Sequence, residues 1–377
     1  MNIKKLKLST QILLFFMFLF SSTFLTTIIS ENPTLNNTDL KTNADEIIIS
    51  TPMNKTYLEP MSGYYPGTWG FENDKDGVVP QGWVDNSQSG CSVSVVSEKM
   101  GHNKVIHLDD DSGNKIYFDG DFTNQSYGTI EMWILAENCT YGFMARLVDR
   151  VSLEQVIRIG IGADKWVYYN GGASNKVFTA LDGVYDPIDN TWYHLRIHFR
   201  CNGAPSYQAL SENKVKIEVD GYISEEVDVW NVKDNIGRLA FATTAAFTTD
   251  GWVDAIGCSW DVDYDIGDNK NEGLLLSFDI NFTPNWLSYS LDGISDKTIL
   301  GDTTIYMLPD GVHSVQVFGN DTMGTMYESE LRYFTIGTKV STPLDIPGYN
   351  LLILIGIIGV VGIGLGRKKL RKQNLRL

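Results

Sequence analysis

The 377-residue sequence has few of the residues that metal and nucleotide sites need. Its four cysteines include no Cys-x-x-Cys pair, which argues against a zinc cluster. Two of the five histidines, His194 and His198, are four apart, but in a predicted strand that spacing is about 13 Å. No nucleophile elbow, phosphate-binding loop or dinucleotide fingerprint occurs. Zinc, nucleotide and serine-triad chemistry are therefore not indicated.

Positive charge is scarce as well. The chain has 30 lysines and arginines against 46 aspartates and glutamates, a net charge of −16. Because a surface that binds nucleic acid must be basic, nucleic acid is excluded as a partner, and docking on anionic lipid is disfavoured. All acidic residues lie between Glu31 and Asp345. This acidity indicates either solubility through self-repulsion or carboxylate loops that hold divalent cations.

Both ends of the chain carry apolar runs. A basic start, residues 1–7, precedes the apolar stretch 12–20, and we predict a secretory signal peptide over residues 1–30, with an uncleaved anchor as the alternative. The uncharged residues 346–366 are long enough to cross a bilayer as a transmembrane helix. The basic tail 367–377 follows, so the C-terminus should be cytoplasmic. The prediction is a single-pass protein of the cell membrane whose bulk is extracellular.

Cysteines and glycosylation motifs fit that location. An even number of cysteines in an oxidising compartment predicts two disulfides, whose connectivity stays open. The cysteines are Cys91, Cys139, Cys201 and Cys258. Six Asn-x-Ser/Thr motifs predict surface glycosylation. Their asparagines are Asn36, Asn54, Asn124, Asn138, Asn281 and Asn320.

Between its ends the chain is organised as two all-β units. Residues 31–64 are polar and rich in Asn and Thr, which predicts a flexible segment, with a short strand as an option at 47–49. Residues 65–265 contain short runs rich in β-branched and aromatic residues, separated by Gly, Asn and Asp. This pattern predicts two packed antiparallel sheets. Residues 266–337 form a second, smaller all-β unit, and 338–345 form a tether.

Four stretches of the larger unit carry a family resemblance. They are Trp69-Gly-Phe-Glu72, Gly128-Thr-Ile-Glu-Met-Trp133, Asn190-Thr-Trp-Tyr-His194, and Val219-Asp-Gly221 followed by Asp254-Ala-Ile-Gly257. In order and spacing they resemble the concanavalin A-like lectin/glucanase superfamily, and its laminin-G-like jelly rolls in particular. The resemblance implies a jelly-roll β-sandwich. Members of that superfamily include sugar binders, adhesion modules and endoglycanases.

The smaller unit has a resemblance of its own. Through Tyr289-Ser-Leu-Asp-Gly293 and Leu308-Pro-Asp-Gly311 it resembles immunoglobulin-like modules of prokaryotic surface proteins, and because it is short we expect a missing or borrowed strand. Pro347-Gly348 and the run after it resemble archaeal signals for sortase-type proteases, with Tyr349 where the signature has Phe. The predicted fold is all-β: an antiparallel jelly-roll sandwich, a small immunoglobulin-like sandwich and a C-terminal transmembrane helix.

An aromatic and polar patch of the larger unit is the predicted ligand site. Sugars are held by aromatic platforms beside polar groups, and core packing is the alternative role for each ring. The patch consists of Trp166, Tyr168, Tyr169 and Asn170, with Trp230 and Trp252 as further candidates.

The laminin-G-like resemblance also implies one calcium ion near the rim. Ca²⁺ takes six to eight oxygen ligands. Glu72 and Asp254 are the predicted ligands, because the first and last strands usually pair in that fold. The oxygen-rich runs 109–114, 261–265 and 268–272 are alternatives, and ordinary polar turns would explain them equally.

The sequence favours binding over catalysis. The superfamily's glucanases carry Glu-x-Asp-x-x-Glu on one strand, and retention needs two carboxyl groups about 5 Å apart. No stretch fits this pattern, and Glu218-Val-Asp220 comes nearest. We predict a membrane-anchored, non-enzymatic surface protein that binds glycan or a surface protein in adhesion or envelope organisation. The alternatives are an envelope polysaccharide hydrolase and a structural surface-layer component without a specific ligand.

Overall fold

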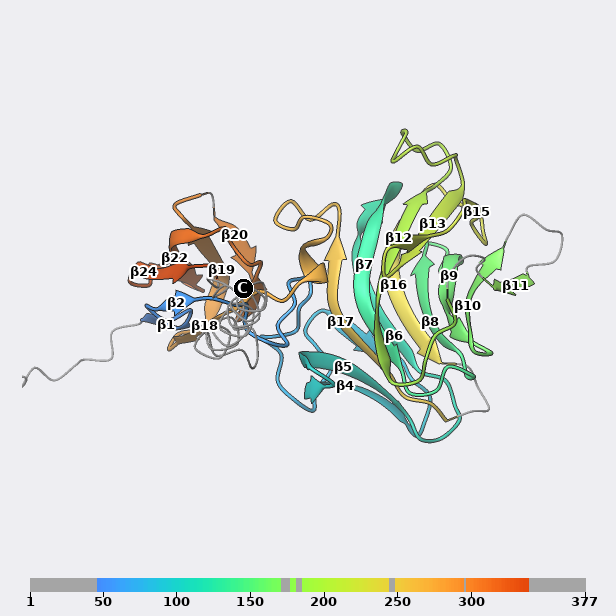
Figure 1. Cartoon of the computed structure of the whole chain (residues 1–377), viewed down its shortest axis with the longest axis horizontal. Helices are drawn as coiled ribbons and strands as arrows, with labels where there is room; N and C mark the ends of the chain where they lie inside the picture. Colours follow the sequence, from blue (N-terminus) through green and yellow to red (C-terminus); the bar gives the residue numbers. More distant parts are fainter. Residues whose placement is uncertain (1–45, 171–176, 181–184, 244–247, 295, 339–377) are drawn as a thin grey trace, which may run out of the picture. The chain divides into compact units, whose positions relative to one another are not determined.

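The computed structural model describes residues 46–170, 177–180, 185–243, 248–294 and 296–338. The predicted signal peptide, transmembrane helix and basic tail lie outside these residues. Within them, no helix is long and apolar enough to cross a membrane. The described chain is all-β apart from one 3-10 turn, η1 (Asp268–Lys270), and its strands form four sheets (Figure 1).

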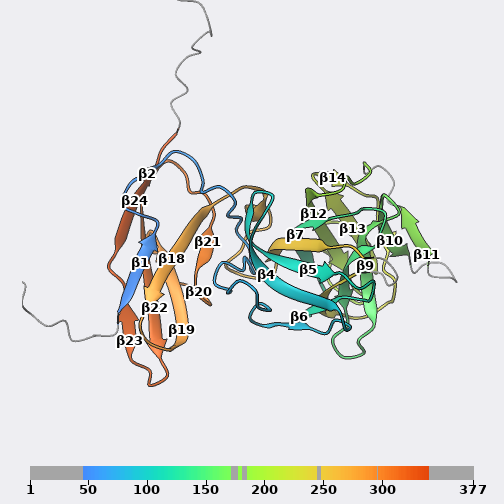
Figure 2. The ribbon, with the colours of Figure 1, turned by 90° about the horizontal axis from the view of Figure 1, so that it is seen from below.

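The larger unit consists of two antiparallel sheets. One sheet runs in the order β14 (Tyr222–Ile223), β13 (Lys214–Val219), β12 (Thr191–Arg200), β7 (Tyr127–Ala136), β17 (Gly251–Cys258), β5 (His102–Asp110) and β4 (Cys91–Lys99), with β15 (Val227–Asp228) beside β13. The other runs β11 (Val177–Ala180), β10 (Lys165–Asn170), β9 (Gln155–Gly162), β8 (Phe143–Val148), β16 (Ile236–Thr243), β6 (Tyr117–Gln125) and β3 (Trp83–Asp85). Both sheets are visible in Figures 1 and 2.

Alternation of side chains explains why these strands pack as a sandwich. Successive residues of a strand face opposite sides, so a strand with apolar residues at every second position has one face for a core. Each such side chain contributes about 1.5–3 kcal/mol on burial. The structure confirms the all-β prediction, with two antiparallel sheets around one shared core in this unit. In β12 the residues that enter the shared core are Tyr193, Leu195, Ile197 and Phe199.

The smaller unit takes strands from both ends of the described chain. One of its sheets runs β1 (Ile47–Thr51), β18 (Leu274–Ile280), β21 (Thr303–Ile305). The other runs β2 (Thr56–Tyr57), β24 (Arg332–Ile336), β22 (Gly311–Asp321), β19 (Pro284–Leu291), β20 (Lys297–Ile299), with β23 (Met326–Glu328) beside β22. The larger sandwich is thus inserted between β2 and β18.

The N-terminal segment is therefore not flexible throughout, as residues 31–64 were predicted to be. Ile47 and Ile49 are 3% and 4% exposed in the core of the smaller unit, while Ile48 between them faces out. Strand β1 pairs antiparallel with β18, and β2 pairs parallel with β24. These strands supply what the short module lacked in residues 266–337. The apolar alternation was too brief to reveal a partner more than 220 residues away.

The two segments that connect the units are paired with each other. The Met61 N–H donates to the Gly273 carbonyl at 2.8 Å, and the Gly273 N–H donates to the Tyr64 carbonyl at 2.7 Å. The Gly63 N–H donates to Glu272 Oε1 at 2.6 Å. Because two segments of the polypeptide run side by side between the units, these hydrogen bonds satisfy backbone N–H and C=O groups of both segments.

The predicted disulfides are not formed, since all four cysteines lie in the described chain as free thiols. Cys139 follows β7, whereas Cys201 follows β12 at the opposite end of the β7–β12 ladder, roughly 30 Å away. Cys201 and Cys258 flank β7, at least about 10 Å apart, which exceeds the reach of a disulfide. Burial raises the pKa of Cys139 and of Cys201 to about 12, which keeps both thiols unreactive.

The predicted glycosylation sites differ in exposure. Asn54, Asn124 and Asn281 are exposed, whereas Asn138 is half-buried and Asn36 lies outside the described residues. Asn320 is half-buried within β22, and its Oδ1 is buried.

Candidate functional site

The outer face of the seven-stranded sheet carries two arginines side by side. Because Phe143, Ala145 and Leu147 of β8 enter the core, Arg146 faces outward. Arg158 of β9 lies directly opposite Arg146 in the antiparallel ladder. Neighbouring strands are about 4.8 Å apart, so the two side chains start next to each other on the same face.

Each arginine lies over a tyrosine ring. Cζ of Arg146 is 5.1 Å from the centre of the Tyr117 ring, and Cζ of Arg158 is 4.4 Å from that of Tyr169. Tyr169 also packs against Trp230, with ring centres 4.5 Å apart. A cation over an aromatic face gains about 0.5–2 kcal/mol. We call Tyr117, Arg146, Arg158, Tyr169 and Trp230 the arginine–aromatic face.

The two guanidinium groups have few partners. Nε of Arg146 and Nε of Arg158 are buried without a hydrogen bond, and no ion pair among the described residues includes either group. Arg146 Nη2 donates one long bond, 3.4 Å, to the Phe241 carbonyl. Burial and repulsion from Arg158 lower the pKa of Arg146 to about 10, which leaves it charged at neutral pH. Donor groups of two cations therefore remain for a ligand.

An acidic group borders this face on strand β6. Asp121 Oδ1 accepts a hydrogen bond from Arg238 Nε at 2.6 Å, and Arg150 lies 3.2 Å from Asp121. Asp119, two residues earlier, accepts from Asn86 and lines a hollow with Asp121 and Arg238. The bond from Arg238 outweighs burial and lowers the pKa of Asp121. A carboxylate held ionised in this way cannot act as the general acid of a glycosidase.

Strand alternation divides the predicted ligand patch. Trp166 is 2% exposed and meets Tyr193 edge-on in the core, so it is not available to a ligand. Tyr168 is buried on the same side. Tyr169 faces outward and belongs to the arginine–aromatic face, whereas the side chain of Asn170 lies outside what the structure describes. The four residues therefore do not form one platform, because consecutive strand residues point to opposite sides.

The two further candidates, Trp230 and Trp252, lie on different sheets of the larger unit or beside them. Trp230 joins Tyr169 in the arginine–aromatic face. Trp252 is 5% exposed on the opposite sheet, stacked on His107 at 4.8 Å, with Lys99 Nζ 3.5 Å from the centre of its ring. Its ring faces are occupied, which removes it as a sugar platform.

Glu72 and Asp254, the predicted cation ligands, are each engaged with a protein partner. The expected pairing of first and last strands exists locally as a bridge between Trp69 and Ile256. The two carboxyl groups, however, are buried and have separate partners: Asp254 contacts His102 Nδ1 at 2.8 Å, and Glu72 accepts from Thr304. Burial raises the pKa of Glu72 to about 8 and that of Asp254 well above its usual range.

Asp254→Asn should remove a pH dependence of stability. Because the folded pKa of Asp254 is raised above its ordinary 3.8, its stabilising contribution is complete below that value and is lost as pH rises toward the folded pKa. His102, whose pKa burial lowers to about 3, stays neutral over this range. In urea denaturation we expect the variant to gain stability relative to the wild type between pH 4 and pH 8. A difference that is constant with pH would show that Asp254 is ionised in the fold.

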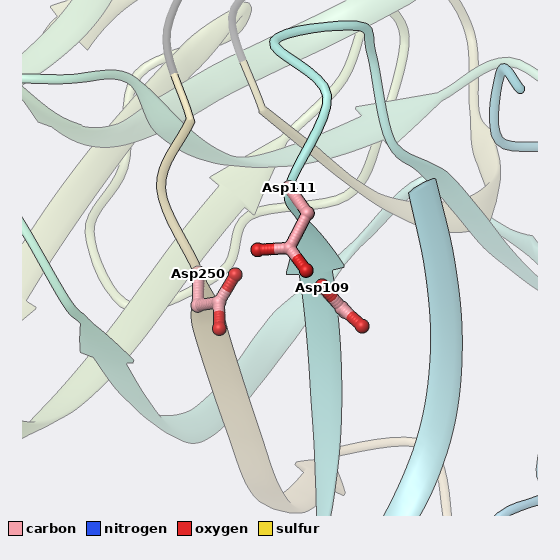
Figure 3. Close-up of side chains that lie close together, drawn as sticks. All are labelled: Asp109, Asp111 and Asp250. Atoms are coloured by element: carbon pink, nitrogen blue, oxygen red, sulfur yellow. The ribbon is translucent and has the colours of Figure 1, made fainter. Parts of the chain in front are cut away.

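Three other carboxylates do come together, on the rim of the larger unit. Oxygens of Asp109, Asp111 and Asp250 lie within 4.8 Å of one another (Figure 3). The run 109–114 pointed to the first two. Asp250 joins them because β17 pairs with β5, and that pairing leaves no mark in the sequence.

The fit of this acidic cluster to Ca²⁺ is incomplete. Both oxygens of Asp250 are engaged, one with His107 Nε2 at 2.8 Å and one with the Asp110 N–H at 3.1 Å. Asp109 accepts from Ser92 at 3.4 Å. Burial, and then the charge of Asp250, raises the pKa of Asp109. Ca²⁺ requires six to eight oxygen ligands, and these three side chains do not provide that many free oxygens.

A second polar cluster lies on the eight-stranded sheet around Glu131, which is 0% exposed. Its carboxylate accepts hydrogen bonds from Arg196 Nε, from the Tyr264 hydroxyl and from the Gly267 N–H, all at 2.5 Å. His194 Nε2 lies 3.4 Å away. These bonds fasten the turn before η1 to the sheet. Because the carboxylate is closed to solvent and fully bonded, this cluster is structural.

Comparison with known proteins gives only loose similarity. No protein-family model and no curated protein matches the sequence. A sialidase structure overlaps with a TM-score of 0.41 at 10% identity, over 53% of this chain and 19% of that chain. A β-glucanase from Bacillus licheniformis gives 0.34 at 14% identity, over 52% and 96%. A family 11 carbohydrate-binding module from Clostridium thermocellum, in complex with a β-1,3-1,4-mixed-linked tetrasaccharide, gives 0.24 at 14%, over 48% and 91%. Such overlaps assign neither activity nor ligand to this chain.

Proposed function

We propose that the protein binds glycans on the outer face of its seven-stranded sheet, without hydrolysing them. The observation that carries this proposal is the arginine–aromatic face, where partly exposed rings stand beside guanidinium donors that lack carboxylate partners. A saccharide presents C–H groups that pack on ring faces and hydroxyls that accept hydrogen bonds. The arginine–aromatic face provides both the ring faces and the hydrogen-bond donors.

Binding is favoured over hydrolysis by the state of the nearby carboxyl groups. A glycosidase needs one carboxyl group with a raised pKa beside one that stays ionised. On this face Asp121 is held ionised by Arg238 and Arg150. The groups with strongly raised pKa, Glu72 and Asp254, are closed to solvent. On this face, therefore, the described carboxyl groups include no acid–nucleophile pair.

The cellular setting of this proposal comes from the ends of the chain. The apolar run 346–366 and the basic tail 367–377 support a membrane-anchored protein whose sandwich is displayed outside the cell. In that setting a glycan-binding face serves adhesion or envelope organisation.

Replacing Tyr169 by alanine tests the proposal. An aromatic side chain at the centre of a binding surface contributes about 2 kcal/mol, or about 30-fold in affinity. We expect Tyr169→Ala to weaken the best ligand found on a glycan array by about that factor, measured by calorimetry on the full-length chain. Tyr222→Ala is the matched control, because Tyr222 is 55% exposed on the opposite sheet.

Two outcomes would contradict the proposal. One is unchanged affinity of Tyr169→Ala; the other is a loss confined to Tyr222→Ala. A chelator should leave the affinity unchanged, because no step of binding passes through the acidic cluster of Asp109, Asp111 and Asp250.

A further inference from the structure

We infer that the ligand is an acidic glycan, whose carboxylate or sulfate groups are bound by Arg146 and Arg158. This inference rests on the proposed function and names the chemistry of the same site. It follows from the way these two cations are placed on the sheet and from what they lack.

The first observation is that like charges stand directly opposite each other. Arg146 and Arg158 are a register pair of β8 and β9, and opposed like charges destabilise a sheet. The cation–π contacts with Tyr117 and Tyr169 offset this repulsion in part. A ligand with negative charge would turn the repulsion into an attraction.

The second observation is that the two charges are buried without a carboxylate partner. Arg158 is hydrogen-bonded to Tyr169, and among the described residues Arg146 donates only to the Phe241 carbonyl. Arg146 is 7% exposed and Arg158 is half-buried. Buried charges in proteins are ordinarily paired, because the cost of removing them from water is high. The nearest acidic group that acts on Arg146 is Asp119, which is already bonded to Asn86 and lies 3.9 Å from Arg238.

A shortage of acids does not explain this arrangement. The chain carries 46 acidic residues against 30 basic ones, and several lysines and arginines of the larger unit, such as Lys104 and Lys214, have carboxylate partners. On the same face Arg238 pairs with Asp121, and Arg150 shares that carboxylate. Among the described arginines of this face, Arg146 and Arg158 are the two without a carboxylate partner.

The third observation is that both cations are arginines and that each packs against a tyrosine ring. A guanidinium presents N–H groups in a planar fork that matches the oxygens of a carboxylate or sulfate. The rings of Tyr117 and Tyr169 pack against the two guanidinium groups. Ala240 lies opposite Arg146 on β16 and has no long side chain to compete for the donors. Two oriented forks beside aromatic rings suit a charged sugar better than a neutral one.

The test compares sugars that differ in charge alone. The probes are tetragalacturonate, the same oligosaccharide with its carboxyl groups reduced, and a sulfated galactotetraose, each titrated into the full-length chain with a chelator present. We expect the acidic probes to bind at least tenfold more tightly than the reduced one. Whichever acidic probe binds more tightly identifies uronate or sulfate as the recognised group.

Variants then assign the preference to the arginines. Arg158→Gln should lower the affinity for the acidic probes at least tenfold while leaving the reduced probe within twofold. Arg158→Lys, which keeps the charge but loses the fork, should recover part of the loss. Lys216→Gln removes the same charge from the opposite sheet and should change nothing.

Equal binding of acidic and reduced probes would overturn the inference, as would a preference that survives in Arg158→Gln. The proposed function would still stand in either case if Tyr169→Ala weakened all probes. Absence of binding by every probe and every arrayed glycan would overturn both. Should Arg158→Gln fail to fold, the wild-type affinity for the acidic probes must fall at least tenfold between 50 and 500 mM salt, and a salt-independent affinity would count against the inference.

Discussion

Replacing Glu131 by alanine should lower the free energy of unfolding of the larger unit by about 3–5 kcal/mol. The reason is that the carboxylate is 0% exposed and pairs with Arg196 at 2.5 Å, which would keep only its longer contact, 3.4 Å, with Glu218. The Tyr264 hydroxyl and the Gly267 N–H would lose their acceptor at the same time. The turn before η1 would come away from the sheet. Chemical denaturation followed by tryptophan fluorescence measures the loss.

The same carboxylate predicts sensitivity to acid. Burial would raise the pKa of Glu131, but hydrogen bonds from His194, Tyr264, Gly267 and Arg196 outweigh it and lower the pKa to about 2. A depressed folded pKa gives stability that is present above the unfolded value of 4.5 and is lost as pH falls toward 2.

The control for this prediction is Glu225→Ala. Glu225 is exposed, so its loss should stay within about 0.5 kcal/mol. If Glu131→Ala were no more destabilising than the control, Glu131 would not be the buried anchor described above.

Removing the apolar side chains of strand β1 should unfold the smaller unit. Ile47 and Ile49 enter its core beside residues of β18 and β22, and truncation of a buried isoleucine to alanine costs about 2–5 kcal/mol. Two such losses on one strand rival the 5–15 kcal/mol that holds a typical domain together. We expect the Ile47→Ala, Ile49→Ala double variant to become sensitive to protease within residues 274–336 while the wild type resists.

Strand β1 provides its own control. Ile48, between the two buried isoleucines, is 48% exposed, so Ile48→Ala should leave protease resistance unchanged. Equal resistance of the double variant and the wild type would show that the N-terminal segment does not complete the smaller unit.

The sequence was informative wherever a pattern was local. Alternation in 192–199 and 214–219 predicted strands β12 and β13, because a strand with one buried face shows its period within six to ten residues. For residues 166–170 the prediction of one ligand patch was wrong, because it gave the number of aromatic residues more weight than their alternation. Trp166 and Tyr168 belong to the core and Tyr169 to the outer face, as alternation alone would have required.

Features that depend on distant pairing could not be predicted. Asp250 reaches Asp109 through the β17–β5 ladder, and Ile47 reaches Ile280 through the β1–β18 pairing. The arginine pair depends on the register of β8 with β9. An arginine at the outward position of an apolar strand was the available local signal, but the absence of a carboxylate partner is visible only in the folded chain.

The most direct measurement is a structure of the full-length chain with tetragalacturonate bound. We predict that the sugar lies across β8, β9 and β10, with a uronate carboxylate within hydrogen-bond distance of Arg146 or Arg158 and a pyranose ring against Tyr169 or Trp230. A sugar bound to the eight-stranded sheet, or beside Asp109 and Asp250 on the rim, would contradict the proposed site.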